Sequence, residues 1–266
     1  MTRSKLDDEK RLYEIIAATK SQKQMYFMGA GHAASFARAG SYVRSYFKYQ
    51  DEVDGIGQYW FIENLEKDYN AKKNEIIKNL QQLMIYIFRK ENLIISYTGT
   101  SDLYKTYISN LIDNLYKEEI NKEPYKFVPN IQNEGFKTPS QVQYVARFGN
   151  FDNVGEYTGA FLVFGMALRY DYLWTQVRVL GGAYGCMTQT NRQKDIYYVS
   201  YRDPNLERTN DVYQNVLEYI DSFNPTEEDL TKYVIGAIGT LDEPLSPRAK
   251  GDTSFNCYMK GLTYED

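Results

Sequence analysis

The sequence has 266 residues, 43% of them apolar, and a formal net charge of −4 at pH 7. These values are typical of a globular protein with one large domain or two modest ones. The mild negative charge gives no electrostatic basis for a nucleic-acid or membrane-surface partner, and no apolar run approaches the length of a membrane span. The chain contains one histidine, His32, so it cannot supply an HxxEH or HxxxH pair for a catalytic zinc.

The first third of the sequence predicts mostly helices. Apolar residues recur at helical spacing within residues 6–18, 32–49, 53–65 and 74–89. The last of these segments carries the clearest stripe, which consists of Ile76, Ile77, Leu80, Leu83, Met84, Ile87 and Phe88. Residues 92–98 then form a short apolar run closed by a glycine, which predicts a buried strand, and a further helix follows.

The composition changes between residues 117 and 139. Three of the seven prolines lie here among charged residues and asparagines, which predicts a linker. The remainder predicts strands at 141–148, 184–190 and 195–202, with helices at 156–172 and 209–220. Two further helix starts are indicated by the capping residues Thr226 and Ser246, the second followed by Pro247.

The most informative segment is Gln176–Gly185, in which a helix is expected to end at two glycines and a strand to begin. Gly181 and Gly182 allow positive φ and the close approach of another chain. Arg178 and Tyr184 flank this turn, so their side chains can project towards one crevice. A guanidinium beside a phenol suits a peptide carbonyl whose oxygen becomes negative in a transition state. The alternative is a plain helix-to-strand turn, with the arginine stabilised by the helix dipole.

A second motif, at residues 28–34, matches the dinucleotide fingerprint GxGxxA. That chemistry needs a strand before the turn and a second strand ending in an acidic residue. The polar segments at 20–24 and 50–55 disfavour both strands, so nucleotide binding through Gly29 and Gly31 is only an alternative. His32 lies in the same motif and is expected to cap or pack at a helix start, because a catalytic histidine needs a positioned partner.

The last expected strand runs into Asp203-Pro204, which predicts a turn. Arg202 and Asp203 either contact a partner or only hold that turn. The two cysteines, Cys186 and Cys257, form no CxxC motif, which favours free thiols in a reducing, cytoplasmic compartment.

Several of these segments together resemble the presequence-protease type of M16 metallopeptidases, in the insulinase/pitrilysin superfamily. The main match joins VRVLGGAYG at 177–185 to SYRDPNL at 200–206. The supporting segments occur in the family's order and are Gly31-His32, NEGF at 133–136, QVQYV at 141–145, IGAIG at 235–239 and LSPRAKG at 245–251. The resemblance covers the chain from about Gly31 onward.

The resemblance implies an α+β fold of M16 metallopeptidase-like, processing-peptidase-like domains, with mainly antiparallel sheets covered by helix pairs. Such enzymes have four homologous domains in two halves, which close like a clamshell around a peptide. On this basis residues 1–119 are the rear of the third domain, 120–135 a linker and 136–266 the fourth domain, truncated at its C-terminus. The abrupt ends of the sequence agree with a piece of a longer protein.

The resemblance also implies a division of labour between the halves. The N-terminal half, which this sequence does not include, binds zinc through an inverted HxxEH motif and a distal glutamate. The C-terminal half holds no metal and supplies an arginine and a tyrosine, here Arg178 and Tyr184, as contacts to the substrate or its oxyanion. Gly181 and Gly182 are the implied substrate-binding positions.

The implied partners are the N-terminal half of the same polypeptide and a peptide substrate, with no nucleic acid or membrane. We expect the isolated chain to be inactive and able to form a homodimer through the surfaces that the other half would cover. The alternative is a structural or partner subunit of the same fold that has lost its metal motif. Retention of Arg178 and Tyr184 favours the enzyme, because a scaffold has no need of this pair.

Overall fold

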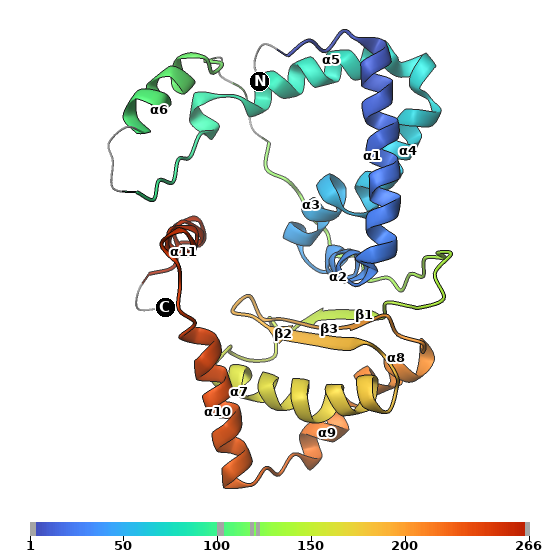
Figure 1. Ribbon diagram of the computed structural model, residues 1–266, viewed down its shortest axis with the longest axis vertical. Coiled ribbons are helices and arrows are strands. Elements are labelled where there is room, and N and C mark those ends of the chain that lie inside the picture. The colour runs from blue at the N-terminus through green and yellow to red at the C-terminus, as the bar shows by residue number, and fades with distance from the viewer. Residues whose placement is uncertain (1–3, 100–103, 118–119, 121–122, 264–266) are drawn as a thin grey trace. The chain divides into compact units, whose positions relative to one another are not determined.

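A computed structural model describes residues 4–99, 104–117, 120 and 123–263 (Figure 1). It contains helices and a small antiparallel sheet, so the expected α+β class is confirmed. In the described part of the chain, no helix combines the length and apolar character needed to cross a membrane. The chain divides into two compact units, the first made of residues 1–14, 68–124 and 242–266 and the second of residues 15–67 and 125–241. The expected division into two M16-like domains stays a prediction.

Three antiparallel strands in the order β1–β3–β2 organise the second unit. They are β1 (Ala146–Asn150), β2 (Gly185–Thr190) and β3 (Asp195–Tyr201). The hairpin expected at 184–202 is confirmed, and its register pairs Thr188 with Tyr198.

The strand expected from residue 141 starts later, because a β-bulge interrupts the β1–β3 ladder. Val145 pairs through its carbonyl with the N–H of Ser200 (2.9 Å), whereas Gln143 pairs with Asp203 (2.8 and 2.9 Å). Two residues, Tyr201 and Arg202, therefore lie opposite the single Tyr144, which is the pattern of a bulge.

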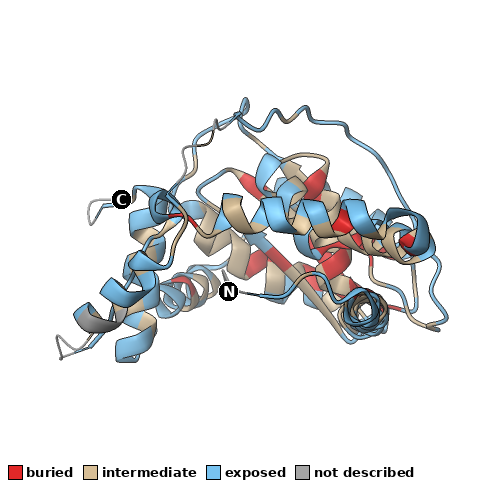
Figure 2. Ribbon diagram, turned by 90° about the horizontal axis from the view of Figure 1, so that it is seen from above, coloured by how far each residue is buried: buried red, intermediate tan, exposed pale blue. Residues whose placement is uncertain are grey.

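Helices cover both faces of this sheet (Figure 1). Helix α2 (Gly31–Ser41) packs on β1 and β3, and the π-helix η2 (Leu168–Val179), which continues α7 (Ala160–Ala167), packs on β2 from the other side. The helix expected at 156–172 is thus confirmed in part and extends further than expected. The core consists of Val145, Leu168, Leu173, Val177, Ala183, Tyr198, Val212, Tyr213 and Val216. Figure 2 shows buried positions where these helices meet the strands.

The remaining helices of the second unit are α3 (Ser45–Asp54), α4 (Ile56–Lys67), α8 (Glu207–Gln214), α9 (Val216–Ser222) and α10 (Glu227–Leu241). Helix α1 (Glu9–Gly29) contributes residues to both units. The single helix expected at 32–49 is wrong, since α3 folds back on α2 and the ring of Phe47 lies 2.7 Å from where a Cβ on Gly40 would be. The expected cap of α10 is confirmed, because Asp229 N–H donates to Thr226 Oγ1 at 3.2 Å.

The first unit contains α5 (Tyr69–Ile87), the 3₁₀ turn η1 (Lys90–Asn92), α6 (Tyr104–Asp113) and α11 (Pro247–Lys260). The expected Ser246 cap of α11 is confirmed by the Ala249 N–H, which donates to Ser246 Oγ at 3.2 Å. The buried strand expected at 92–98 is wrong, because residues 93–98 are irregular and mostly exposed. Among the described residues the sheet belongs to the second unit, and an extended segment without a neighbouring strand has no ladder to stabilise it.

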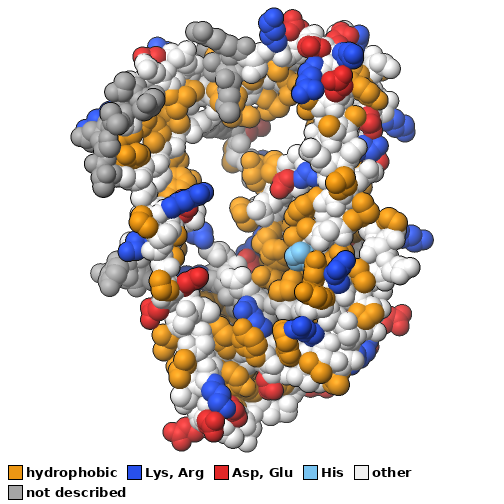
Figure 3. Space-filling model, in the orientation of Figure 1, with side chains coloured by type: hydrophobic (Ala, Val, Ile, Leu, Met, Phe, Trp, Pro, Cys, Tyr) orange, Lys and Arg blue, Asp and Glu red, His pale blue; other side chains and the backbone are white. Residues whose placement is uncertain are grey.

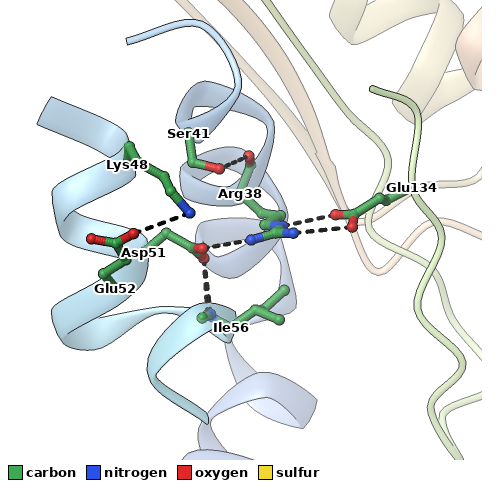
Figure 4. Close-up of polar contacts among 8 residues, drawn as sticks. Arg38, Ser41, Lys48, Asp51, Glu52, Ile56 and Glu134 are labelled. Carbon is green, nitrogen blue, oxygen red and sulfur yellow. Dashed lines mark hydrogen bonds and ion pairs between the residues drawn. The ribbon is translucent and has the colours of Figure 1, made fainter. Parts of the chain in front are cut away.

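A partly buried arginine, with 11% of its side chain exposed, joins α2, α3 and the extended segment that follows residue 124 (Figure 4). Arg38 of α2 donates to Asp51 Oδ2 (2.6 Å) and to both carboxylate oxygens of Glu134 (2.7 and 3.0 Å). Burial lowers the pKa of Arg38, but the hydrogen bond with Glu134 and the charge of Asp51 outweigh it and raise the pKa. The Arg38 hydrogen bond in turn lowers the pKa of Glu134. The arginine and Glu134 are therefore both charged at neutral pH.

Asp51 has a second role at the start of α4. Its side chain is fully buried, and Oδ1 accepts the backbone N–H of Ile56 at 3.1 Å. This satisfies one of the N–H groups that the first turn of a helix leaves without a partner. One carboxylate thus pairs with Arg38 and caps a neighbouring helix.

A second arginine fixes the helix pair to the sheet. Arg44, between α2 and α3, donates to Asp195 at the start of β3 and to both oxygens of Asp152 (2.6 and 2.9 Å). It also donates to the carbonyl of Gln193. The link holds Arg44 in an extended conformation (φ −128°, ψ 137°), which separates the two helices.

Replacing Asp51 with alanine should destabilise the chain by about 3 kcal/mol, because it removes the buried partner of Arg38 and the acceptor for Ile56 N–H. Urea unfolding followed by circular dichroism measures the change. Glu52→Ala is the matched control, since Glu52 lies on the same helix and forms an exposed pair with Lys48 (3.2 Å), which contributes less than about 0.5 kcal/mol. Equal effects of the two substitutions would contradict this prediction.

Candidate functional site

Two glycines end η2 with unusual geometry. Long π-helices are rare, and this one closes through Leu180 N–H to Thr175 O (2.9 Å). Gly182 N–H then bonds Arg178 O (2.9 Å) and Ala183 N–H bonds Val177 O (3.1 Å), an arrangement similar to a Schellman motif. The chain leaves the helix at once and enters β2.

The two glycines serve this turn for different reasons. Gly182 has a positive φ of 79°, which favours glycine. Gly181 is buried, and a Cβ there would lie 2.4 Å from the carbonyl oxygen of Val177. The close approach of the turn to its own helix therefore requires glycine at 181.

An open pocket of about 680 Å³ lies beside the turn. Arg178, Gly182 and Tyr184 line it, so the structure brings together three of the four predicted site residues, and the buried Gly181 is not part of the lining. The other lining residues are Val142, Trp174, Val179, Ala183 and Arg202.

The two predicted contact residues are available to a ligand. The guanidinium carbon of Arg178 lies 3.9 Å from the centroid of the Trp174 ring, a cation–π contact that orients the side chain. Tyr184 is 68% exposed, and its backbone N–H donates to Tyr201 O at 3.0 Å. Within the part of the chain that the structure describes, neither the Arg178 guanidinium nor the Tyr184 hydroxyl has a hydrogen-bonding partner.

A cluster of aromatic rings packs against Tyr184. Its ring meets Tyr201 edge-on at 5.7 Å, and Tyr201 in turn meets His32 at 4.7 Å and Tyr144 at 5.8 Å. Tyr144 is fixed by its hydroxyl, which donates to Met28 O at 2.9 Å. Figure 3 shows hydrophobic side chains around the single histidine on the face in view.

His32 occupies a packing position rather than a cap. The N-cap of α2 is Ala30, and the imidazole lies against Tyr201. Burial lowers the pKa of His32, so the ring is neutral at pH 7, and its Nδ1 is buried without a partner in the described part of the chain.

The dinucleotide interpretation of residues 28–34 is wrong. Gly29 ends α1 and Gly31 begins α2, so a helix stands where the motif needs a strand. Gly31 is explained by packing, since a Cβ there would lie 2.3 Å from the ring of Tyr144.

Sequence reasoning missed Trp174 and left Arg202 undecided. Trp174 could have been found from its spacing, because residues four apart on a helix share a face with each other, as Trp174 and Arg178 do. Arg202 lines the pocket, whereas Asp203 is fully buried and accepts Asn205 N–H (2.9 Å) and Thr209 Oγ1–H (2.7 Å). Asp203 therefore holds the turn.

The described residues do not fit a zinc site. They contain no group of three or more His, Cys, Asp or Glu side chains that could hold a metal ion. Cys186 is a free thiol, and burial raises its pKa to about 12.

Comparisons with known proteins decide the family. Residues 133–266 match the family described as PreP C-terminal domain, and residues 1–65 match a family described as associated with peptidases of the C subfamily of M16. The chain belongs to the PreP C-terminal domain family. The resemblance to the presequence-protease type of M16 peptidases, inferred from the sequence, is thereby confirmed.

Several curated proteins are similar over nearly the whole chain. Protein HypA of Clostridium perfringens is 36% identical over 98% of the chain and 27% of its own length. Presequence protease 1, chloroplastic/mitochondrial, of Arabidopsis thaliana is 26% identical over 97% of the chain and 24% of its own length. The mitochondrial presequence protease of Yarrowia lipolytica is 28% identical over 96% of the chain and 26% of its own length. The chain spans about a quarter of the length of these relatives.

The turn generates a prediction about stability. Gly181→Ala should destabilise the chain by about 1–3 kcal/mol, because the new methyl group overlaps a backbone carbonyl. Gly182→Ala should destabilise it by about 1 kcal/mol, because alanine disfavours positive φ. Thermal unfolding measures both. Gly185→Ala is the matched control, since a Cβ at Gly185 would meet nothing within 4 Å. A control as unstable as Gly181→Ala would contradict the explanation.

Proposed function

We propose that this chain is the non-catalytic C-terminal part of a zinc metalloendopeptidase for unstructured peptides, and that it supplies substrate contacts to the zinc-binding half. Membership of the PreP C-terminal domain family supports a role in a peptidase. The names of the relatives, two of them presequence proteases, support a peptide substrate for the whole protein.

The observation that carries the proposal is the pair of donors in one open pocket. Arg178 and Tyr184 both line it, and the described structure leaves the guanidinium and the hydroxyl without internal partners. Donors that are fixed before the reaction stabilise developing negative charge without a reorganisation cost. Trp174 packs against the guanidinium and Tyr201 against the phenol ring, which restricts the conformations of both donors.

On this proposal the chain's own residues perform binding and charge stabilisation. Tyr184 O–H donates to the oxygen of the scissile carbonyl or of a neighbouring peptide carbonyl, and Arg178 N–H groups donate beside it. The open pocket admits an extended peptide, whose carbonyls lie in reach of both donors. Closure of a four-domain clamshell around the peptide, as the resemblance implies, would bring the pocket to the reacting bond.

Tyr184→Phe in the full-length protein should lower kcat/KM for peptide cleavage by about 10²–10³, the usual loss of one oxyanion donor. Initial rates with an unstructured fluorogenic peptide measure it. Tyr170→Phe is the control, because Tyr170 is similarly exposed (58%) and does not line the pocket. An unchanged kcat/KM in Tyr184→Phe would instead favour a structural or partner subunit.

The isolated 266-residue chain should contain no stoichiometric zinc and cleave no peptide. It has one histidine, and the residues that the structure describes hold no cluster suited to a metal. Elemental analysis of the purified chain and a peptide-cleavage assay test both statements. About one zinc per chain, or cleavage that a chelator abolishes, would contradict the proposal.

A further inference from the structure

A second arginine in the pocket has no role in the proposed function. Arg202 is exposed and lines the pocket with Arg178, and these two are the charged residues of the lining, with no carboxylate among its other members. In the described part of the chain, neither guanidinium forms an ion pair. Two unneutralised cations beside apolar walls form a site for a negative group.

Arg202 lines the pocket with a backbone conformation that is unfavourable for arginine. Its φ is +49°, which is uncommon for any residue but glycine and costs of order 1 kcal/mol. The surroundings impose this conformation, since the next residue, Asp203, is buried and bonded on its backbone to Gln143. Arg202 is also one of the two bulged residues opposite Tyr144, and bulges commonly re-aim a side chain beside a site.

The two guanidiniums are presented differently. Arg178 lies within 3.9 Å of the Trp174 ring centroid, which leaves the N–H groups at the edge of the guanidinium plane free. Arg202 is held by its backbone, because Tyr184 N–H donates to Tyr201 O (3.0 Å) and Arg202 O (3.3 Å). The same hydrogen bonds place Tyr184, just before β2, beside Arg202, just after β3, and both residues line the pocket.

We propose that Arg202, together with Arg178, recognises a carboxylate of the bound peptide and so determines substrate specificity. Arginine binds carboxylate through paired N–H donors. The carboxylate belongs either to an acidic side chain or to the C-terminus of the peptide. This inference rests on the proposed function, because it assigns a preference to the same peptide pocket.

The charge of this chain gives no general attraction for acidic peptides. Its net charge is −4, so a preference for a carboxylate that arises within this chain requires a local cationic site. High net basic charge, the usual source of non-specific binding to anions, is absent from this sequence.

The test uses the full-length protein and three labelled, unstructured peptides that differ in one group. The first has glutamine at an internal position and an amidated C-terminus, the second has a free C-terminus, and the third has glutamate in place of the glutamine. Fluorescence anisotropy measures Kd after a chelator has been added to stop cleavage, so that the peptides stay intact. We expect at least one carboxylate peptide to bind about 10-fold more tightly than the neutral peptide, as for a hydrogen bond to a charged group.

Arg202→Gln should remove that preference and leave the affinity for the neutral peptide within about 2-fold, whereas Arg202→Lys should retain part of it. Arg192→Gln is the matched control, because Arg192 is exposed, carries the same charge and does not line the pocket. Loss of the preference in Arg192→Gln would assign it to general electrostatics and overturn the proposal.

The outcomes separate this inference from the proposed function. Equal affinity for neutral and carboxylate peptides, with weaker cleavage in Tyr184→Phe, overturns the carboxylate site and leaves the proposed function intact. A preference that survives Arg202→Gln overturns the role of Arg202. Absence of binding by every peptide overturns both proposals. The second and third peptides show which carboxylate is recognised.

Discussion

A buried carboxylate and the arginine that neutralises it are the constraint on which the second unit depends. Burying Asp51 is unfavourable unless a cation pairs with it, and the partly buried Arg38 does so while also binding Glu134 from another segment. The network therefore forms only when α2, α3 and the segment near residue 134 are all in place. Because Asp51 also caps α4, the start of that helix depends on the same charge.

This constraint extends to the pocket through α2. The helix packs on β1 and β3 and carries His32 against Tyr201, whose ring supports Tyr184. Arg44 adds a second attachment at the start of β3. The pocket itself forms where three backbone features meet: the end of a π-helix, the start of β2 and the bulge after β3. None of these alone would bring the two arginines and Tyr184 together.

Local signals in the sequence predicted part of this structure. The hairpin at 184–202 alternates and turns within one segment, and the caps at Thr226 and Ser246 depend on neighbouring residues, so all were predictable. The run at 92–98 looked like a strand because it is apolar, but a strand needs a partner that this sequence pattern does not reveal. The break between α2 and α3 depends on Phe47 packing against Gly40 and on Arg44 reaching Asp195, contacts that depend on the tertiary fold.

The candidate site was predictable to the same extent. Gly-Gly between a helix and a strand marked the turn, and the flanking arginine and tyrosine followed from it. The role of Arg202 did not follow, because a positive φ at arginine arises from the bulge and the buried Asp203 rather than from local preference. The π-winding of η2 was also missed. Its buried residues Leu168, Leu173 and Val177 lie five and four positions apart, a spacing that fits i→i+5 hydrogen bonds, but three positions are too few to separate a π-helix from an α-helix by sequence.

The two adjacent glycines have unequal tolerance to mutation. Position 182 needs a backbone conformation that asparagine also adopts, so a substitution by asparagine during evolution can keep the turn. Position 181 needs the absence of any side-chain atom, and no other amino acid offers that. A single hydrogen atom at Gly181 thus limits how far related sequences can diverge while η2 still delivers Arg178 to the pocket.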